Sequence, residues 1–341
     1  MNSSKSKIRI AINGFGRIGR MFFRIAHKRP NFEIVAINDV MEPATMAHLL
    51  KYDSVHKKFD GKVEFNNDHI EVNGKKVKVF TENDPGKLPW RDLDIDVVIE
   101  ATGLFTRRKD ALKHVEQSGA KKVIISAPAK GENDDVQYIV LGVNDHLINK
   151  DDKVISNASC TTNNVAPLIM VLDRFWGIEK AFITTVHSYT RDQNILDGPH
   201  NDLRRGRAAA YSIVPTTTGA AKAVTKIFPH IAKNIGGAGI RVPVPDGSLT
   251  DVTCTLSSPA STEEINAKFK EASASYLQGI LEYTEDPIVS MDVIGNPHSA
   301  VFDSKLTAVL GERNKLVKVV AWYDNEVGYS YRLAELVEKF A

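Results

Sequence analysis

Cysteine is scarce in this chain: Cys160 and Cys254 are the only two among 341 residues. Two thiols cannot supply the disulfide framework of a small secreted protein, so a reducing compartment suits the chain. The ten histidines contain no HExxH motif or other close pairing, and no CxxC pair is present. We therefore predict no metal site.

Long apolar runs and an excess of one charge are also missing. No stretch reaches the ~20 apolar residues that span a bilayer, and residues 1–7 are polar, so we expect no signal peptide and a cytoplasmic location. Lys and Arg outnumber Asp and Glu by only 44 to 42, which argues against a nucleic acid or a membrane as partner. The hydrophobic fraction of 43% and the charged fraction of 25% are typical of a soluble enzyme, here with two domains.

A glycine-rich turn near the start of the chain is the first positive signal. The pattern Gly-Phe-Gly-Arg-Ile-Gly occupies 14–19, after an apolar strand predicted at 8–12 and before a predicted helix at 20–26. A second strand is predicted at 32–37, and Asp39 follows it. This order of strand, glycine turn, helix, strand and acid is the fingerprint of a dinucleotide-binding unit.

The three glycines of this turn have separate roles. Gly14 permits the tight turn, Gly16 lets the backbone approach a pyrophosphate, and Gly19 lets the helix pack closely on the strand. The phosphates then lie at the N-terminus of the helix. Asp39 is placed to bind the ribose hydroxyls of the adenosine.

Further strands alternate with helical stretches in the first half of the chain. The predicted strands are 97–100, 123–126, 138–141 and 154–156. A helical stretch at 109–116 separates the first two, and Thr102 and Gly103 follow a strand end. Alternation of this kind predicts a doubly wound parallel sheet, a Rossmann fold, with ligands along its carboxyl edge.

The second half has a different pattern of strands and helices, which predicts an α+β domain with a mixed sheet. Its predicted strands are 181–186, 241–244, 251–256 and 318–322, and its predicted helices are 262–271 and 330–340. The segment between His187 and Pro215 is polar and has no periodicity. Loops of this length in compact domains are usually functional.

Cys160 lies between a predicted strand and a helical run at 165–172. A thiol at a helix N-terminus is stabilised as the nucleophilic thiolate. The alternative is a small buried residue, but hydroxyl and amide side chains surround Cys160 on both sides. His187 follows another predicted strand and could take the thiol proton, although a lone histidine is more often structural.

Arginines in the second half suggest an anion site. Arg204, Arg205 and Arg207 lie close together, Arg241 stands alone, and a threonine-glycine run occupies 215–219. Guanidinium groups suit bidentate binding of phosphate, and hydroxyls with backbone amides suit its other oxygens. The alternative is a solvated charge cluster.

Several motifs together resemble the phosphorylating glyceraldehyde-3-phosphate dehydrogenases, over nearly the whole chain. The motifs are Asn-Gly-Phe-Gly-Arg-Ile-Gly at 13–19, Ser-Cys-Thr-Thr-Asn at 159–163, His-Ser-Tyr-Thr at 187–190, Asp-Leu-Arg-Arg at 202–205, Pro-Thr-Thr-Thr-Gly-Ala-Ala-Lys at 215–222 and Trp-Tyr-Asp-Asn-Glu at 322–326.

This resemblance implies an NAD-dependent oxidation of D-glyceraldehyde 3-phosphate with inorganic phosphate to 1,3-bisphosphoglycerate, a step of glycolysis and gluconeogenesis. Cys160 would be the nucleophile, through a hemithioacetal and a thioester, and His187 the base. The resemblance also implies a homotetramer. Its domain division would be 1–157 with 325–341 for NAD binding, and 158–324 for catalysis.

The resemblance further implies three groups of binding residues. Around the phosphate of the substrate would lie Thr190, Asp192 and Arg241. Around inorganic phosphate would lie Ser159, Thr161, Arg205, Thr218 and Gly219. NAD would be bound by Asn13, Gly14, Gly16, Arg17, Ile18, Gly19, Asp39, Thr102, Gly103, Ser126, Asn325 and Tyr329.

The chain departs from the usual family pattern at Asn83, Asn164, Arg191 and Gly206, none of which removes a catalytic group. Two other functions stay open on the sequence. One is an erythrose-4-phosphate dehydrogenase, which shares the nucleophile motif, although the 187–190 and 216–219 runs favour the triose phosphate. The other is a nucleotide-bound scaffold or redox sensor without turnover, against which the Cys-His-Arg set argues.

Overall fold

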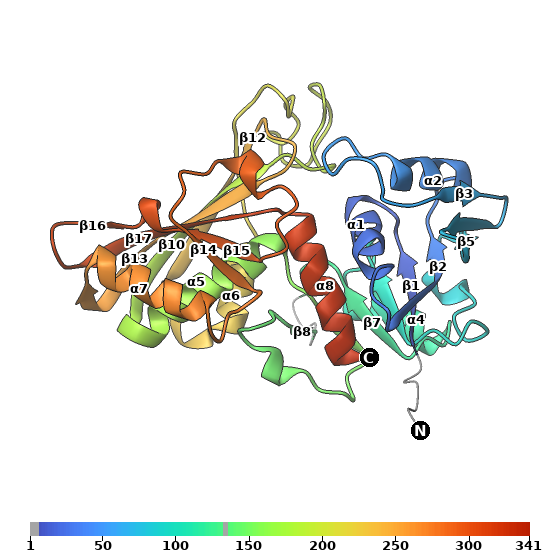
Figure 1. Cartoon of the computed structure of the whole chain (residues 1–341), viewed down its shortest axis with the longest axis horizontal. Helices are drawn as coiled ribbons and strands as arrows, with labels where there is room; N and C mark the ends of the chain where they lie inside the picture. The colour runs from blue at the N-terminus through green and yellow to red at the C-terminus, as the bar shows by residue number, and fades with distance from the viewer. Residues whose placement is uncertain (1–6, 132–135) are drawn as a thin grey trace. The chain divides into compact units, whose positions relative to one another are not determined.

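A computed structural model describes residues 7–131 and 136–341 of the chain, which form two compact units. Unit 1 holds the described residues up to Ile139, with His146–Ala158 and Ser330–Ala341. Unit 2 holds Val140–Asp145 and Ser159–Tyr329. The chain thus passes between the units four times: on either side of Val140–Asp145, beside Cys160, and inside its last helix (Figure 1). None of the described helices is long and apolar enough to cross a membrane.

Unit 1 is built on a sheet whose order among the described residues is β3-β4-β5-β2-β1-β6-β7-β9-β8. The strands are β1 (Ile8–Asn13), β2 (Phe32–Asn38), β3 (Val63–Phe65), β4 (His69–Val72), β5 (Lys75–Phe80), β6 (Val97–Glu100), β7 (Lys122–Ile125), β8 (Gln137–Tyr138) and β9 (Val154–Ser156). All pairs from β5 to β8 are parallel, and β3, β4 and β5 form antiparallel pairs. The order β5-β2-β1-β6-β7-β9 is that of a Rossmann sheet, so the predicted fold class is confirmed.

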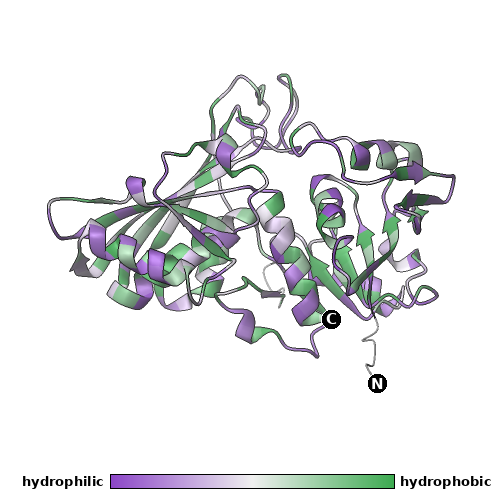
Figure 2. Cartoon of the chain, in the orientation of Figure 1, coloured by the Kyte–Doolittle hydropathy of each residue, from purple (hydrophilic) through white to green (hydrophobic). Residues whose placement is uncertain are grey.

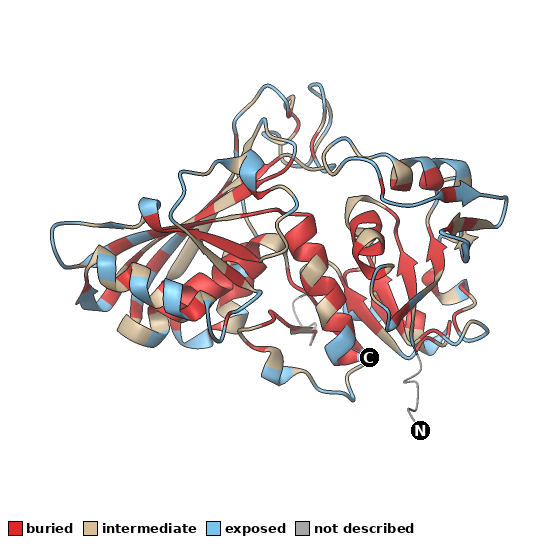
Figure 3. Cartoon of the chain, in the orientation of Figure 1, coloured by how far each residue is buried: buried red, intermediate tan, exposed pale blue. Residues whose placement is uncertain are grey.

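Burial explains why these strands read as apolar runs. Every residue of β6 is buried, as expected of a parallel strand covered on both faces, and Figures 2 and 3 show the apolar, buried strands at the centre of this unit. The helices of unit 1 are α1 (Arg17–Ala26), α2 (Pro43–Lys51), α3 (Arg108–Ala111), α4 (Lys113–Glu116) and most of α8 (Val327–Phe340).

Two elements of unit 1 differ from the sequence prediction. The helix expected at 109–116 is two single turns, α3 and α4, which meet at Leu112. The strand expected at 138–141 is wrong beyond its first residue: β8 ends at Tyr138, and the buried residues Ile139 and Val140 lead into a turn that starts at Leu141. Burial made these residues apolar, and apolar runs this short do not distinguish a strand from a buried turn.

Unit 2 is a mixed sheet of order β11-β12-β10-β13-β17-β15-β14 within the described chain, with β16 beside β17. Its strands are β10 (Ile178–Ser188), β11 (Val214–Thr216), β12 (Ile235–Val242), β13 (Ser248–Ala260), β14 (Leu281–Thr284), β15 (Ala300–Asp303), β16 (Ala308–Val309) and β17 (Asn314–Tyr323). The pairs β10–β12 and β14–β15 are parallel, and the other pairs are antiparallel.

Three helices lie along one face of this sheet (Figure 1): α5 (Cys160–Trp176), α6 (Ala220–Ile227) and α7 (Thr262–Ser273). Helix α7 begins with a reciprocal capping box between Ser261 and Glu264. The largely buried helix α5 starts at the cysteine singled out above, so that residue holds the first helical position.

Candidate active site

The turn that presents Cys160 is strained. Ala158 has φ of +52°, a left-handed conformation that is costly for any residue except glycine. Ser159 is the N-cap of α5, and its Oγ accepts a hydrogen bond from Thr162 N at 3.0 Å. A sharp turn followed by a capped helix start fixes Cys160 at the first helical position, where backbone N–H groups point toward the sulfur.

His187 faces this thiol from β10. Its Nε2 lies 3.4 Å from Sγ of Cys160, within hydrogen-bond distance for sulfur. The imidazole is buried, and its ring meets that of Tyr323 edge-on. Tyr323 in turn shares hydrogen bonds between its hydroxyl and those of Thr161 and Thr185. The structure therefore brings together the two predicted catalytic residues, 27 positions apart in sequence, inside unit 2.

Arg241, on β12, contacts the other nitrogen of this imidazole. Its Nη1 lies 2.6 Å from His187 Nδ1 and donates to Ser188 O at 2.8 Å. Nδ1 also lies 2.8 Å from Ser188 O. A guanidinium only donates, so the Arg241 contact favours the tautomer with a lone pair on Nδ1 and the proton on Nε2, whereas the Ser188 carbonyl favours a proton on Nδ1. With Arg241 displaced, Nδ1–H can donate to Ser188 O and Nε2 is free to accept a proton.

Burial controls the charges of this pair. It raises the pKa of the Cys160 thiol, against the opposing effects of the Arg241 charge and of hydrogen bonds from Thr161. Burial also lowers the pKa of His187 to about 3, and the neighbouring Arg241 adds to that effect. Burial therefore opposes the thiolate that the helix N-terminus and Arg241 favour. The thiolate expected from the sequence stays a prediction.

The second thiol is a poor nucleophile. Cys254 is buried within β13 and burial raises its pKa to about 12. It behaves as a small core residue, so reactivity among the two cysteines falls to Cys160.

Arg205 anchors a second cluster of polar groups. Its Nη1 bonds to Asp192 Oδ2 at 2.5 Å, its Nε to Thr216 Oγ1 at 2.9 Å, and its Nη2 to Thr217 O at 3.2 Å. Thr216 Oγ1 also donates to Asp202 Oδ2. Burial alone would raise the pKa of Asp192, but the hydrogen bond and charge of Arg205 lower it. The structure thus joins Asp192 and Arg205, which the sequence assigned to two different phosphate sites.

The remaining predicted phosphate residues lie on nearby segments of unit 2. Thr190 follows the end of β10, and Thr218 precedes helix α6, where its Oγ1 accepts from Ala220 N at 3.2 Å. Gly219 is the N-cap of α6 and has open space where a Cβ would be. Sequence reasoning missed Thr216 and Asp202 as partners of Arg205, although both lie inside motifs that it quoted.

The glycine turn of unit 1 has the geometry that its sequence predicts. Gly14 has φ of +95°, and a Cβ there would meet Thr102 N at 2.5 Å. A Cβ on Gly19 would meet Gly14 O at 2.1 Å, whereas Gly16 has nothing within 4 Å on that side. Helix α1 has no side-chain cap and no acid in its first turn. Its first N–H groups and the open side of Gly16 therefore fit the phosphates of a dinucleotide.

Asp39 and Arg17 flank this turn. The carboxylate of Asp39 accepts from Phe15 N at 2.6 Å and from Met41 N at 3.1 Å. Arg17 makes a two-pronged ion pair with Asp53, at 2.6 and 3.2 Å. Burial acts to raise the pKa of Asp53, but bonds from backbone amides, led by His56, and the Arg17 charge hold it at about 2.

The other predicted cofactor residues are divided between the units. Ser126 follows β7, where its backbone N–H bonds to Glu100 O at 2.9 Å, and Ile18 is half-buried on α1. Asn325 belongs to unit 2, where its Oδ1 accepts from Ser188 Oγ at 2.9 Å and Ser248 Oγ at 2.7 Å. These two bonds fix which way the Asn325 amide points. Tyr329 is buried on α8.

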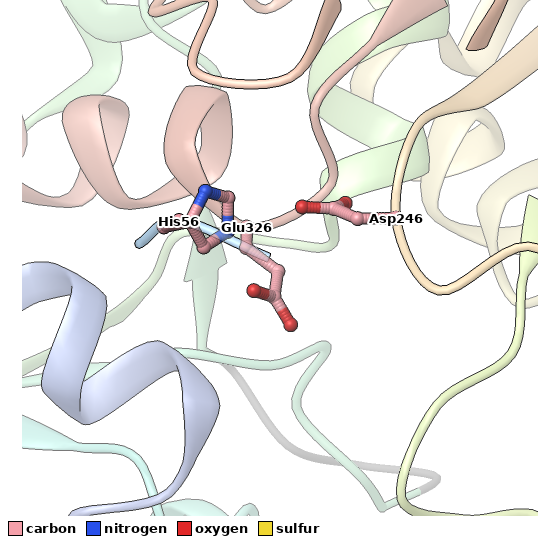
Figure 4. Close-up of side chains that lie close together, drawn as sticks. All are labelled: His56, Asp246 and Glu326. Atoms are coloured by element: carbon pink, nitrogen blue, oxygen red, sulfur yellow. The ribbon is translucent and has the colours of Figure 1, made fainter. Parts of the chain in front are cut away.

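Two further carboxylates of unit 2, Asp246 and Glu326, lie within 4.8 Å of each other and are buried (Figure 4). His56, drawn in the same picture, belongs to unit 1. Asp246 Oδ1 accepts from Gly247 N at 2.9 Å. Two carboxylates fall short of the ligand set that a structural metal requires, so we assign no ion to them.

Comparison with known proteins covers both units. The family model described as "Glyceraldehyde 3-phosphate dehydrogenase, NAD binding domain" matches residues 8–108, and that described as "Glyceraldehyde 3-phosphate dehydrogenase, C-terminal domain" matches residues 159–325. The chain is 54% identical to a glyceraldehyde-3-phosphate dehydrogenase of Thermotoga maritima, over 97% of this chain and 98% of the relative. The identity is 53% for that of Borreliella burgdorferi, over 97% and 99%, and 52% for that of Geobacillus stearothermophilus, over 98% of each.

Proposed function

The chain belongs to the glyceraldehyde-3-phosphate dehydrogenase family, and we propose that it oxidises D-glyceraldehyde 3-phosphate to 1,3-bisphosphoglycerate with NAD and inorganic phosphate. The observation that carries this proposal is the Cys160–His187 pair, 3.4 Å apart, with an arginine at 2.6 Å from the far side of the imidazole. A nucleophile, a base and a phosphate-binding cation then adjoin one another within unit 2.

Chemistry begins with addition of the Cys160 sulfur to the aldehyde carbon, which forms a C–S bond and a hemithioacetal. As the bond forms, His187 Nε2, the nearest base, takes the thiol proton and passes it to the former aldehyde oxygen, so that the hydroxyl is made and His187 is neutral again. Backbone N–H groups at the start of α5 are placed to stabilise the developing oxyanion. When bound, NAD supplies the acceptor for the hydride that leaves the hemithioacetal carbon. His187 takes the hydroxyl proton in the same step, which leaves a thioester on Cys160.

Arg241 couples substrate binding to the state of this base. In the unliganded chain it occupies Nδ1 of His187 and favours the tautomer whose Nε2 already holds a proton. The phosphate of the substrate is a stronger partner for a guanidinium than a neutral imidazole. Once Arg241 turns to that phosphate, Nδ1–H can donate to Ser188 O and Nε2 can accept. The pKa of His187 also rises when the arginine leaves.

Arg205 serves the second half of the reaction. Inorganic phosphate attacks the thioester carbon, the C–S bond breaks, and an acyl phosphate leaves while Cys160 recovers its proton. Arg205 and Thr218, with the open N-terminus of α6 at Gly219, offer one cation and neutral donors for that anion. Ser159 and Thr161, the residues before and after Cys160, would add donors for this anion close to the reacting sulfur. Thr190 and Asp192 would complete the adjoining site for the substrate's phosphate.

Unit 1 and Asn325 hold the cofactor in this proposal. Gly16 and the start of α1, with Arg17 and Ile18, would hold the pyrophosphate. Asp39 would bind the ribose of the adenosine. The backbone at Thr102, Gly103 and Ser126 would border the rest of the dinucleotide. Asn325, whose Oδ1 is already taken by two serine hydroxyls, has its amide N–H groups left to orient the nicotinamide. We keep 1–157 with 325–341 as the cofactor domain and 158–324 as the catalytic domain.

The segment after β10 supports a homotetramer. Five large apolar side chains between residues 195 and 213 are more than two-thirds exposed: Ile195, Leu196, Leu203, Tyr211 and Ile213. Exposed apolar clusters of this kind are typical of subunit interfaces. Sedimentation of the purified protein tests this, with a mass of four chains of 37.7 kDa expected. We also propose a cytoplasmic location, since both thiols are unpaired.

One assay tests the proposed reaction. The protein is mixed with NAD, phosphate and glyceraldehyde 3-phosphate, and NADH absorbance is followed, with erythrose 4-phosphate in a parallel sample. We expect turnover that requires phosphate and that is faster with the triose phosphate. Preference for erythrose 4-phosphate would reassign the substrate, and no NADH from either aldehyde would leave only a binding function.

A further inference from the structure

Unit 1 contains a buried carboxylate and a buried imidazole that the reaction above does not use. Glu100 is the last residue of β6 and His114 lies on α4; both side chains are fully buried. Oε2 of Glu100 lies 3.1 Å from Nε2 of His114. Within residues 7–131 and 136–341, no lysine or arginine pairs with Glu100. A buried carboxylate without a cation persists only if hydrogen bonds satisfy it.

Glu100 has such bonds on both oxygens. Oε2 accepts from Asn13 Nδ2 at 2.6 Å as well as from His114. Oε1 accepts from Thr102 N at 2.9 Å and from Thr102 Oγ1. One carboxylate therefore ties together the end of β1, the loop after β6, and α4.

Trp90 fixes the protonation of His114. Its Nε1 lies 2.9 Å from His114 Nδ1. An indole N–H only donates, so Nδ1 carries the lone pair and Nε2 carries the proton. His114 therefore donates to Glu100, and its two bonds have defined directions that different side chains can reproduce separately.

The groups tied by Glu100 border the proposed cofactor site. Asn13 precedes Gly14, and a Cβ on Gly14 would lie 2.5 Å from Thr102 N, so the glycine turn and the Thr102 loop are in contact. Oδ1 of Asn13 also accepts from Asn38 Nδ2 at 2.7 Å, immediately before Asp39. The ends of β1, β2 and β6 are thus held to one another by side chains.

We propose that Glu100 and His114 are positioning residues for dinucleotide binding: the carboxylate sets the spacing of the Gly14 turn and the Thr102 loop, and His114 orients the carboxylate. This rests on the proposed function only in taking NAD as the ligand. Neither side chain touches the cofactor in this account, so both act through the backbone of the two loops.

Two substitutions separate the bonds of His114. In His114→Gln the amide nitrogen lies near the place of Nε2 and can still donate to Glu100, but the acceptor for Trp90 is lost. In His114→Asn the amide oxygen lies near the place of Nδ1 and can still accept from Trp90, but the donor to Glu100 is lost. NAD affinity is measured by calorimetry on the full-length protein, together with tryptophan emission and the thermal midpoint.

We expect each variant to change one readout and to leave the other unchanged. His114→Asn should weaken NAD binding about 10-fold, because one charged hydrogen bond is lost, while tryptophan emission stays unchanged. His114→Gln should bind NAD within about 2-fold of wild type, with altered emission from Trp90. Hydrogen exchange at the Thr102 and Leu104 amides should be faster only in His114→Asn. Equal loss of NAD affinity in both variants, or none in either, overturns the proposal.

Glu100→Gln gives a second test of the proposal, in case His114→Asn does not fold. It keeps the shape of the side chain but turns one acceptor into a donor, facing either Thr102 N or Asn13 Nδ2. We expect NAD binding to fall about 10-fold while the KM for glyceraldehyde 3-phosphate changes less than 2-fold. If Glu100→Gln binds NAD as wild type does, the proposal fails even where His114→Asn is unstable. Wild-type protein that binds no NAD would instead refute the proposed function.

Discussion

Nη1 of Arg241 lies 2.6 Å from Nδ1 of His187, on the side of the imidazole opposite Cys160. The contact explains two properties of the unliganded site at once. It favours the tautomer with the ring proton on Nε2, and it adds a positive charge that helps burial to lower the pKa of His187 to about 3. In the proposed reaction, an anion that draws Arg241 away would therefore make this base available.

Substitution of Arg241 should distinguish substrates by their phosphate. We expect Arg241→Ala to lower kcat/KM for glyceraldehyde 3-phosphate by roughly 10- to 100-fold, because one or more charged hydrogen bonds are lost. Unphosphorylated glyceraldehyde cannot lose a contact that it never makes, so its kcat/KM should fall much less. Equal losses for the two aldehydes would show that Arg241 does not bind the substrate's phosphate. Arg205→Ala is the matched control, since it should raise the KM for inorganic phosphate instead.

The thiol chemistry should follow the raised pKa of Cys160. Neutral iodoacetamide should modify the unliganded protein once per chain, at Cys160, with a rate that keeps rising as the pH passes above the ordinary range for a thiol near 8.5. His187→Ala should change this rate little in the unliganded protein, because the Arg241 contact favours the tautomer of His187 whose Nε2 already holds a proton. Peptide mass spectrometry identifies the site. A rate already at its plateau at pH 7, or modification of Cys254 first, would contradict this.

Cofactor choice should depend on Asp39. Its carboxylate accepts hydrogen bonds from Phe15 N in the glycine turn and from Met41 N after β2, and these bonds oppose its turning away from a 2′-phosphate. Like charges about 4 Å apart at an effective dielectric of ~20 repel by roughly 4 kcal/mol. After screening, we expect NAD to be favoured over NADP on the order of 100-fold in kcat/KM. Asp39→Ala should narrow that ratio. Comparable values for both cofactors in the wild type would refute the assignment.

The Arg17–Asp53 ion pair should make unit 1 sensitive to acid. The pKa of Asp53 is about 2 in the folded chain, below its ordinary value of 3.8. Its contribution is therefore present above pH ~4 and is lost as the pH falls toward 2. The difference corresponds to about 2 kcal/mol. We expect Asp53→Asn to lower the free energy of unfolding by that amount at pH 7 and by roughly half of it at pH 3, measured by urea denaturation. A pH-independent difference would mean that the charge of Asp53 is not the cause.

Local sequence patterns predicted the elements that local physics determines. The glycine turn at 14–19, the capped start of α7 and the helix after Cys160 all depend on neighbouring residues, and the Rossmann class followed from their order. The patterns failed where tertiary packing decides. Burial opposes the effect of the helix N-terminus on Cys160, and the 138–141 run leaves its strand after Tyr138. The Arg241–His187 contact joins parallel strands 54 positions apart, and no local signal marks such a pair.

The link from Glu100 to His114 escaped the sequence for the same reason. Glu100 reads as the end of an apolar strand, and His114 as one residue of a predicted helix. Only the packing of α4 against the sheet reveals that both are buried and share a hydrogen bond. Motifs thus indicated which residues react, and the structure was needed to show what holds them in place.

Acylation of Cys160 in the absence of phosphate tests the central claim most directly. The protein is mixed rapidly with NAD and glyceraldehyde 3-phosphate in phosphate-free buffer, NADH is followed by stopped flow, and the quenched protein is analysed by mass spectrometry. We predict a burst of about one NADH per chain and a 3-phosphoglyceroyl thioester on the peptide of Cys160. Added phosphate should release this acyl group. No burst, or an unmodified Cys160 peptide after a burst, would contradict the account.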